Sequence, residues 1–245
     1  MKKMIFIFLL SLMFVDVTSQ ENAANNLLVY ADSEKTVISD KEDYSGNNRS
    51  QKVSGKSNGH DYVDLGLSVK WATCNIGASN PEDYGNYFAW GETVPKEEYT
   101  KDNSITYRKR KFGEKINVGG NPKYDAAAAN WGGGWRMPTC EEIEELYKKC
   151  TWKWTEMNGV KGCKVIGPNG NSIFLPAAGE FHRILNYNAE EYGYYWSSKP
   201  SALYKGHDAA YQIYFSKSCE GRDIAAKSIY IETREHGKTI RPVIE

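Results

Sequence analysis

The strongest pattern of apolar and polar positions lies in the stretch Asn130–Cys150, which reads NWGGGWRMPTCEEIEELYKKC. Its second half predicts an amphipathic α-helix, because four apolar side chains recur at the spacing i, i+3, i+4 and i+7, which places them on one helical face. These four are Ile143, Leu146, Tyr147 and Cys150. We expect the rest of the chain to be organised around this helix, since little else in the sequence has the pattern of a long helix.

The residues at both ends of this pattern predict where the helix begins and ends. Thr139 is a favourable N-cap, and Glu142 follows three residues later, where its side chain completes a capping box. Acidic residues fill the first turns, and Lys148 and Lys149 lie in the last turn, so the charges suit the two ends of the helix dipole. The local signals therefore agree with the apolar pattern.

A glycine run and a second, shorter helix are expected just before it. The glycines Gly132–Gly134 allow positive φ angles, and the flanking Trp131 and Trp135 carry large apolar surfaces that we expect to be buried. Asp125, followed by Ala126–Ala129, predicts a short helix with an aspartate cap. This part of the chain is therefore expected to be helix, turn and helix.

Most of the remaining pattern is typical of short β-strands, with runs of β-branched and aromatic residues between turn residues. The dipeptides Asn158-Gly159 and Asn169-Gly170 predict tight turns. Pro95–Asn121 is interpreted as an irregular insertion. Strands are expected within or at Tyr62–Thr73, Tyr87–Trp90, Trp152–Thr155, Cys163–Ile166, Ser172–Leu175, Tyr194–Ser198, Ala209–Phe215, Ile229–Thr233 and Thr239–Val243. The predicted class is α+β, with many short antiparallel strands and about two helices.

The N-terminal region differs from the rest in composition. Lys2 and Lys3 precede the apolar run Met4–Val15, which is too short to span a membrane and predicts a signal peptide over residues 1–19. Polar and charged residues dominate 20–58, so we expect a flexible leader there and a folded domain over 59–245. The mature protein is therefore expected to be exported to the periplasm, cell surface or medium, without stable membrane insertion.

Charge and motif spacing exclude several classes of function. The chain has 31 Lys and Arg against 31 Asp and Glu, which gives no field to attract nucleic acid. The five cysteines form no Cys-x-x-Cys pair, so no zinc knuckle or thioredoxin-like site is predicted. The four histidines have no paired-ligand spacing, and neither a Gly-x-Ser-x-Gly motif nor a P-loop is present. We therefore expect no catalytic site, cofactor or metal.

Several short motifs occur in an order that resembles one bacterial family. They are DLGLSVKWATCNIGA (64–78), YFAWGET (87–93), RMPT (136–139), CTWKWTEMNGVKG (150–162), NSIFLPAAG (171–179), GYYWSS (193–198) and IRPV (240–243). Together they resemble the Fibrobacter succinogenes major paralogous domain family, which is abundant in secreted proteins of Bacteroidetes. The resemblance covers about residues 59–245 and implies a C-type-lectin-like fold of the formylglycine-generating-enzyme type.

The resemblance does not extend to the chemistry known on that fold. Formylglycine-generating enzymes hold copper with two cysteines near the C-terminal end, whereas this sequence has only Cys219 there. The Glu-Pro-Asn, Gln-Pro-Asp and Trp-Asn-Asp motifs of calcium-dependent lectins are absent too. Cys74 and Cys150 lie inside the family-like motifs, so a disulfide between them is one hypothesis, and two buried free thiols are the other. No pairing is assigned to Cys140, Cys163 or Cys219.

What the resemblance does imply is a binding surface in the C-terminal third, where related proteins present variable residues on a rigid scaffold. The matching stretches, 199–208 and 216–236, contain aromatic and basic side chains of the kind enriched in interfaces, whereas Trp196 is expected in the core. The predicted ligand-binding residues are Tyr204, Lys205, His207, Tyr211, Arg222 and Arg234. We expect an exported, non-enzymatic module that binds a protein or glycan. The alternatives are a structural or adhesive surface component and, third, an oxidase or hydrolase.

Overall fold

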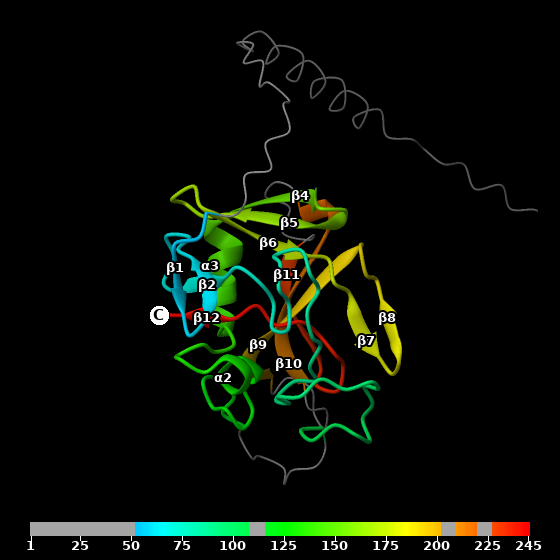
Figure 1. Cartoon of the computed structure of the whole chain (residues 1–245). Coiled ribbons are helices and arrows are strands. Elements are labelled where there is room, and N and C mark those ends of the chain that lie inside the picture. Colours follow the sequence, from blue (N-terminus) through cyan, green and yellow to red (C-terminus); the bar gives the residue numbers. More distant parts are fainter. Residues whose placement is uncertain (1–51, 108–115, 202–208, 220–226) are drawn as a thin grey trace, which may run out of the picture. The chain divides into compact units, whose positions relative to one another are not determined.

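The computed structural model describes residues 52–107, 116–201, 209–219 and 227–245 (Figure 1). The chain divides into two compact units, Met1–Asn48 and Arg49–Glu245, and all the described residues belong to the second. The predicted signal peptide and most of the predicted leader lie outside the described residues. The sheet structure begins at Gly55, inside the segment that the sequence analysis assigns to the leader.

One antiparallel sheet joins the beginning and the end of this unit. Its strand order is β1-β2-β3-β12, so the last strand pairs with β3 (Figure 1). The strands are β1 (Gly55–Ser57), β2 (His60–Val63), β3 (Lys70–Ala72) and β12 (Val243–Ile244). Both termini of the unit are therefore held in one sheet.

A second sheet confirms the three strands predicted after the long helix. It has the order β4-β5-β6, with every pair antiparallel. The strands are β4 (Thr151–Met157), β5 (Val160–Ile166) and β6 (Ser172–Pro176). Asn158 and Gly159 connect the first two with φ angles of 48° and 85°, the conformation that a two-residue hairpin with an Asn-Gly turn requires.

The third sheet carries the C-terminal strands in the order β11-β10-β9. These are β9 (Tyr192–Ser201), β10 (Ala209–Ser216) and β11 (Lys227–Thr233), with the short helix η1 (Lys217–Cys219) after β10. Beside them stands a two-stranded hairpin, β7 (Glu180–His182) and β8 (Leu185–Tyr187), which the sequence did not predict (Figure 1).

Both predicted helices are confirmed in position and in capping. α2 (Ala126–Trp131) begins at Asp125, whose carboxylate accepts hydrogen bonds from the backbone N–H groups of Ala127 and Ala128. α3 (Cys140–Lys149) begins at Thr139, and the capping box with Glu142 is present. The side chain of Arg136 adds a two-pronged ion pair to Glu142, at 2.6 and 2.8 Å. The RMPT segment is therefore fixed to the helix that follows it.

The core forms two clusters of buried side chains. In one, Ile143 and Leu146 of α3 pack with Tyr195, Ile213 and Phe215 of the β9–β10 strands. The other is built around four tryptophans: Trp90, Trp131, Trp135 and Trp196. All three glycines of the run before α3 have positive φ angles of 58° to 88°, as predicted, because the turn between the two helices needs them.

Two predicted strands are wrong in their extent. Tyr87–Trp90 is not a strand, and it contributes a single bridge between Phe88 and Lys238. Thr239–Val243 is mostly irregular, with a bridge from Thr239 to Tyr195 and a strand that begins only at Val243. These segments fit between other elements and bond to them residue by residue, which a local pattern does not reveal.

The structure also bears on the predicted fold class, the predicted insertion and the pairing of the cysteines. The described residues form mostly antiparallel sheets with two α-helices, which confirms an α+β protein. The parts of the predicted insertion 95–121 that the structure describes contain no helix or strand. The sulfur atoms of Cys74 and Cys150 are not joined in a disulfide, so the disulfide hypothesis for this pair is wrong, and Cys140 is not in a disulfide either. Cys163 is in a disulfide.

Candidate ligand-binding face

The site with the most unusual chemistry is built around the segment Gly237–Thr239, close to the C-terminus. The backbone of Gly237 exchanges two hydrogen bonds with Phe181 of β7, at 2.8 and 2.9 Å. Lys238 exchanges two with Phe88, and the N–H of Trp196 in β9 donates to the carbonyl of Thr239. The segment therefore fills the space between β9 and the β7–β8 hairpin and connects their backbones.

This segment places a lysine in the protein interior. The side chain of Lys238 is fully buried, and its ammonium group lies over the rings of Tyr194 and Trp196, at 4.8 and 5.0 Å from their centroids. It forms an ion pair with the carboxylate of Glu180 on β7. Burial lowers the pKa of Lys238, and the charge of Glu180 opposes that shift. A buried cation of this kind requires its partner.

Glu180 is the carboxylate that neutralises this cation. Burial alone would raise its pKa, but the hydrogen bond from His236 and the charge of Lys238 lower it to about 2. The contact between the Nδ1 atom of His236 and the Glu180 carboxylate is 3.2 Å long. On its other side, the His236 ring stacks on His182, with 4.9 Å between ring centroids. The ion pair therefore links the β7–β8 hairpin to the segment Gly237–Thr239, which is bonded to β9.

The ring of Tyr194, which faces the ammonium group of Lys238, belongs to a stack of three tyrosines on the β9–β10 strands. The ring centroids of Tyr192 and Tyr214 are 5.5 Å apart, and those of Tyr194 and Tyr214 are 5.7 Å apart. All three rings are half-buried. Burial raises the pKa of Tyr194 to about 12, and its hydroxyl accepts a hydrogen bond from Asn188, so this ring is held in place. We call Tyr192, Tyr194 and Tyr214 the tyrosine face.

The β7–β8 hairpin exposes several apolar side chains of its own. Ile184, Leu185 and Tyr187 are all exposed, which is unusual for three large apolar side chains within four residues. Asn188 follows directly after this group and bonds to Tyr194. The hairpin is therefore connected to the tyrosine face through Asn188.

Four of the six predicted ligand-binding residues lie outside the described residues: Tyr204, Lys205, His207 and Arg222. The first three belong to the chain between β9 and β10, and Arg222 belongs to the chain between η1 and β11. The length of β10, roughly 25 Å for eight residues, separates the points where these connections leave the strand. Tyr204, Lys205 and His207 therefore precede β10 and Arg222 follows it, so the two connections join opposite ends of this strand.

The structure places the other two predicted residues in different environments. Tyr211 is half-buried on β10, with the ammonium group of Lys199 5.8 Å from its ring centroid. Arg234 is buried, and its guanidinium lies 4.3 Å from the ring centroid of Trp90 and donates to the carbonyl of Ala209. Arg234 therefore has a structural position in the interior. Trp196 is fully buried, as predicted.

Glu180, Lys238 and the tyrosine face were not predicted from the sequence. A signal for the tyrosines was present, because Tyr192 and Tyr194 alternate within a predicted strand and so share one face. No such signal marks the ion pair, whose two residues are 58 positions apart. Charged residues at isolated positions are normally interpreted as exposed.

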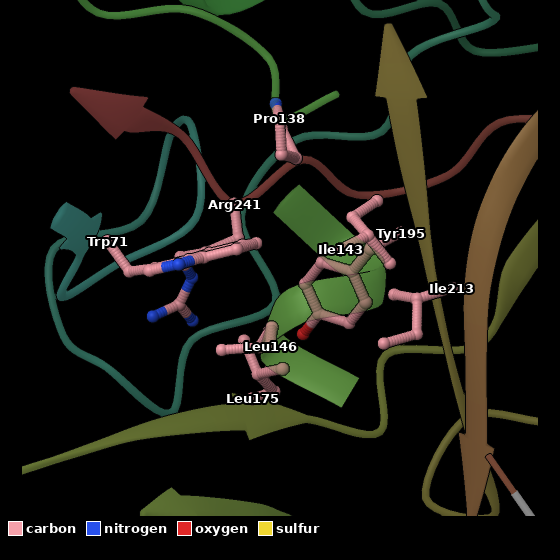
Figure 2. Close-up of a pocket in the computed structure, with 8 residues that line it drawn as sticks. All are labelled: Trp71, Pro138, Ile143, Leu146, Leu175, Tyr195, Ile213 and Arg241. Carbon is pink, nitrogen blue, oxygen red and sulfur yellow. The ribbon is translucent and has the colours of Figure 1, made fainter. Parts of the chain in front are cut away.

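An interior cavity lies between α3 and the strands β9 and β10. It has a volume of about 10 Å³, room for at most one water molecule. Figure 2 shows the side chains that surround it, with Ile143 and Leu146 of α3 facing Tyr195 and Ile213. The nearby Arg241 is fully buried and donates to the carbonyl of Ala72, the side chain of Asn75 and the carbonyl of Phe174. The cavity is therefore part of the core.

The described residues also bear on metal sites and membrane-spanning helices. Among them, no three His, Cys, Asp or Glu side chains are grouped so that they could hold a metal ion. Neither helix in the described ranges has the length and apolar character needed to cross a membrane. Comparisons with protein-family models, curated proteins and solved structures find no match.

Proposed function

We propose that the protein is an exported, non-enzymatic binding module with a C-type-lectin-like fold. The observation that carries the proposal is the tyrosine face, which presents three mutually stacked, half-exposed rings on a strand pair. Tyrosine supplies a large contact area with little loss of conformational entropy, and rings that are already stacked lose less still. The motif order and the α+β architecture support the fold assignment.

The ligand that fits this surface best is a protein. The β7–β8 hairpin, which Asn188 connects to Tyr194, exposes the aliphatic side chains of Ile184 and Leu185, and a folded partner that also covered the hairpin would remove them from water. A hydrophilic glycan could stack on the rings but would gain little from covering the aliphatic groups.

The buried ion pair supports a binding role over a catalytic one. Burial lowers the pKa of Lys238, which is the direction that a nucleophilic amine needs, but its side chain is fully buried among the residues around it. No substrate can reach an ammonium group that Tyr194, Trp196 and Glu180 enclose. Its role is to hold the hairpin and the tyrosine face in a fixed relation.

The test is a binding screen against surface-exposed proteins and a glycan panel, with calcium and with chelator. The variant Tyr192→Ser/Tyr214→Ser removes two rings of the tyrosine face, and we expect its affinity for any captured ligand to fall by at least about a hundredfold. Val94→Ser is the matched control, because Val94 is an exposed apolar residue outside this surface. Equal binding by all three proteins would refute the assignment, and binding to glycans alone would change the ligand class.

A further inference from the structure

The sheet β11-β10-β9 ends in a strand whose outer edge has no neighbour in the described part of the chain. This strand, β11, has seven residues and pairs with β10 along its whole length. An edge of that length is normally shortened, charged, or interrupted by proline or a bulge, because it can pair with another strand. The centre of β11 is instead Ile229, Tyr230 and Ile231, three strong strand formers.

The direction of the free backbone groups follows from the hydrogen bonds of β9. The N–H of Trp196 donates to Thr239, on the side of β9 away from β10. Gln212 lies opposite Trp196, so this pair makes no mutual hydrogen bonds and Gln212 turns its backbone groups toward β11. There it lies opposite Tyr230. Tyr230 therefore bonds to β10.

Its two neighbours consequently point the other way. Backbone groups alternate between the two edges of a strand, so the N–H and C=O groups of Ile229 and Ile231 face outward. Within the described ranges they have no hydrogen-bond partner on that side. By contrast, Thr233 has its N–H bonded to the side chain of Glu232. The open edge thus presents four unpaired groups, spaced symmetrically about Tyr230.

This symmetry leads to a specific occupant. We propose that β11 pairs antiparallel with β11 of a second copy of the same chain, about a two-fold axis at Tyr230. Ile229 of one copy then lies opposite Ile231 of the other, and the four outward groups on each chain form four hydrogen bonds. Glu232 is the only charged residue in 229–233, and it comes opposite position 228, a serine, so like charges do not meet.

The exposed side chain at the centre fits the same arrangement. Tyr230 is 57% exposed. It shares the outer face of the sheet with Tyr214, its diagonal neighbour on β10. Pairing at the two-fold axis places it against Tyr230 of the second copy. The aromatic side chains then run without interruption from the tyrosine face of one copy to that of the other, across one six-stranded sheet.

The test introduces a positive or a negative charge at position 230, which lies on the two-fold axis. Dimerisation is measured by sedimentation velocity of the purified full chain over a wide concentration range. The wild-type protein is expected to form dimers that dissociate on dilution. Tyr230→Lys and Tyr230→Glu each place two like charges in contact, so each should weaken dimerisation at least tenfold. A mixture of the two variants should restore it. Because Tyr230 is exposed, both variants should retain the wild-type circular dichroism spectrum and melting temperature within a few degrees.

Tyr187→Lys is the matched control, because Tyr187 is also an exposed tyrosine but lies on β8 of the β7–β8 hairpin. Its substitution should leave the dimer unchanged. A wild-type chain that stays monomeric at all concentrations overturns the proposal, as does a dimer unaffected by both Tyr230 variants. A monomer that binds added extended peptides at β11 would assign the edge to a foreign strand instead. None of these results depends on a ligand of the tyrosine face.

Discussion

The ion pair between Glu180 and Lys238 makes the stability of this protein depend on one carboxylate. The change Glu180→Gln keeps the size of the side chain and removes its charge, which leaves the fully buried Lys238 without a counter-ion. Breaking a buried pair in this way costs about 3–5 kcal/mol, because the remaining charge stays desolvated. We therefore expect the free energy of unfolding at neutral pH to fall by that amount.

The pKa of Glu180 gives an independent magnitude. Its value in the folded protein is about 2, compared with an ordinary value of 4.5. At about 1.4 kcal/mol for each pH unit, this difference corresponds to about 3 kcal/mol, in agreement with the cost of breaking the pair. Because the folded pKa is the lower one, this stabilisation is complete above about pH 4.5 and is lost as the pH falls toward about 2.

The assay is urea unfolding followed by tryptophan fluorescence, for the wild type and Glu180→Gln at several pH values between 7 and 2. The difference between the two proteins should be largest at neutral pH and shrink through the acid range. Glu190→Gln is the control, because Glu190 and its partner Lys161 are exposed and the expected change is below about 1 kcal/mol. A Glu180→Gln protein within about 0.5 kcal/mol of the wild type at pH 7 would refute the reasoning.

Three further predictions concern the core. Asp125→Ala removes the acceptor of the backbone N–H groups of α2 and Met137, and urea unfolding should show a loss of at least about 3 kcal/mol. Arg241→Lys cannot reproduce the separate hydrogen bonds of the buried guanidinium, so we expect a loss of about 2–4 kcal/mol by the same measurement. Without reductant, a thiol reagent should label Cys74, Cys140 and Cys150 in urea, whereas native Cys140 should react slowly, because burial raises the pKa of its thiol. Mass spectrometry would detect a Cys74–Cys150 disulfide as two missing labels.

The elements that sequence reasoning found are those whose signals are local. The cap at Thr139, the apolar face of α3 and the Asn158-Gly159 turn each lie within a few residues of the structure that they specify. The β7–β8 hairpin was missed because its turn contains no glycine, and Arg183 takes a φ of 56° there. A residue with a side chain rarely adopts that conformation, so the pattern gave no reason to expect a turn.

The candidate site was harder to predict because its chemistry depends on distant residues. Glu180 and Lys238 are ordinary charged residues until the bonds of Gly237 and Thr239 bring them together. Arg234 illustrates the opposite error, since an arginine in a polar stretch was expected at the surface and packs on Trp90 instead. Composition indicates which side chains suit an interface, but only long-range pairing decides which of them reach it.

The position of the last strand has a consequence for how the chain folds. Arg241 bonds to Ala72 and Asn75, which precede it by 169 and 166 positions, and β12 pairs with β3. Contacts of such long sequence separation form slowly, because most of the chain must be ordered before they can be made. A nascent chain that lacks residues 236–245 cannot complete either the first sheet or the clamp on the β7–β8 hairpin. Folding of this unit is therefore deferred until these residues have been made, and their loss would be far more damaging than their small number suggests.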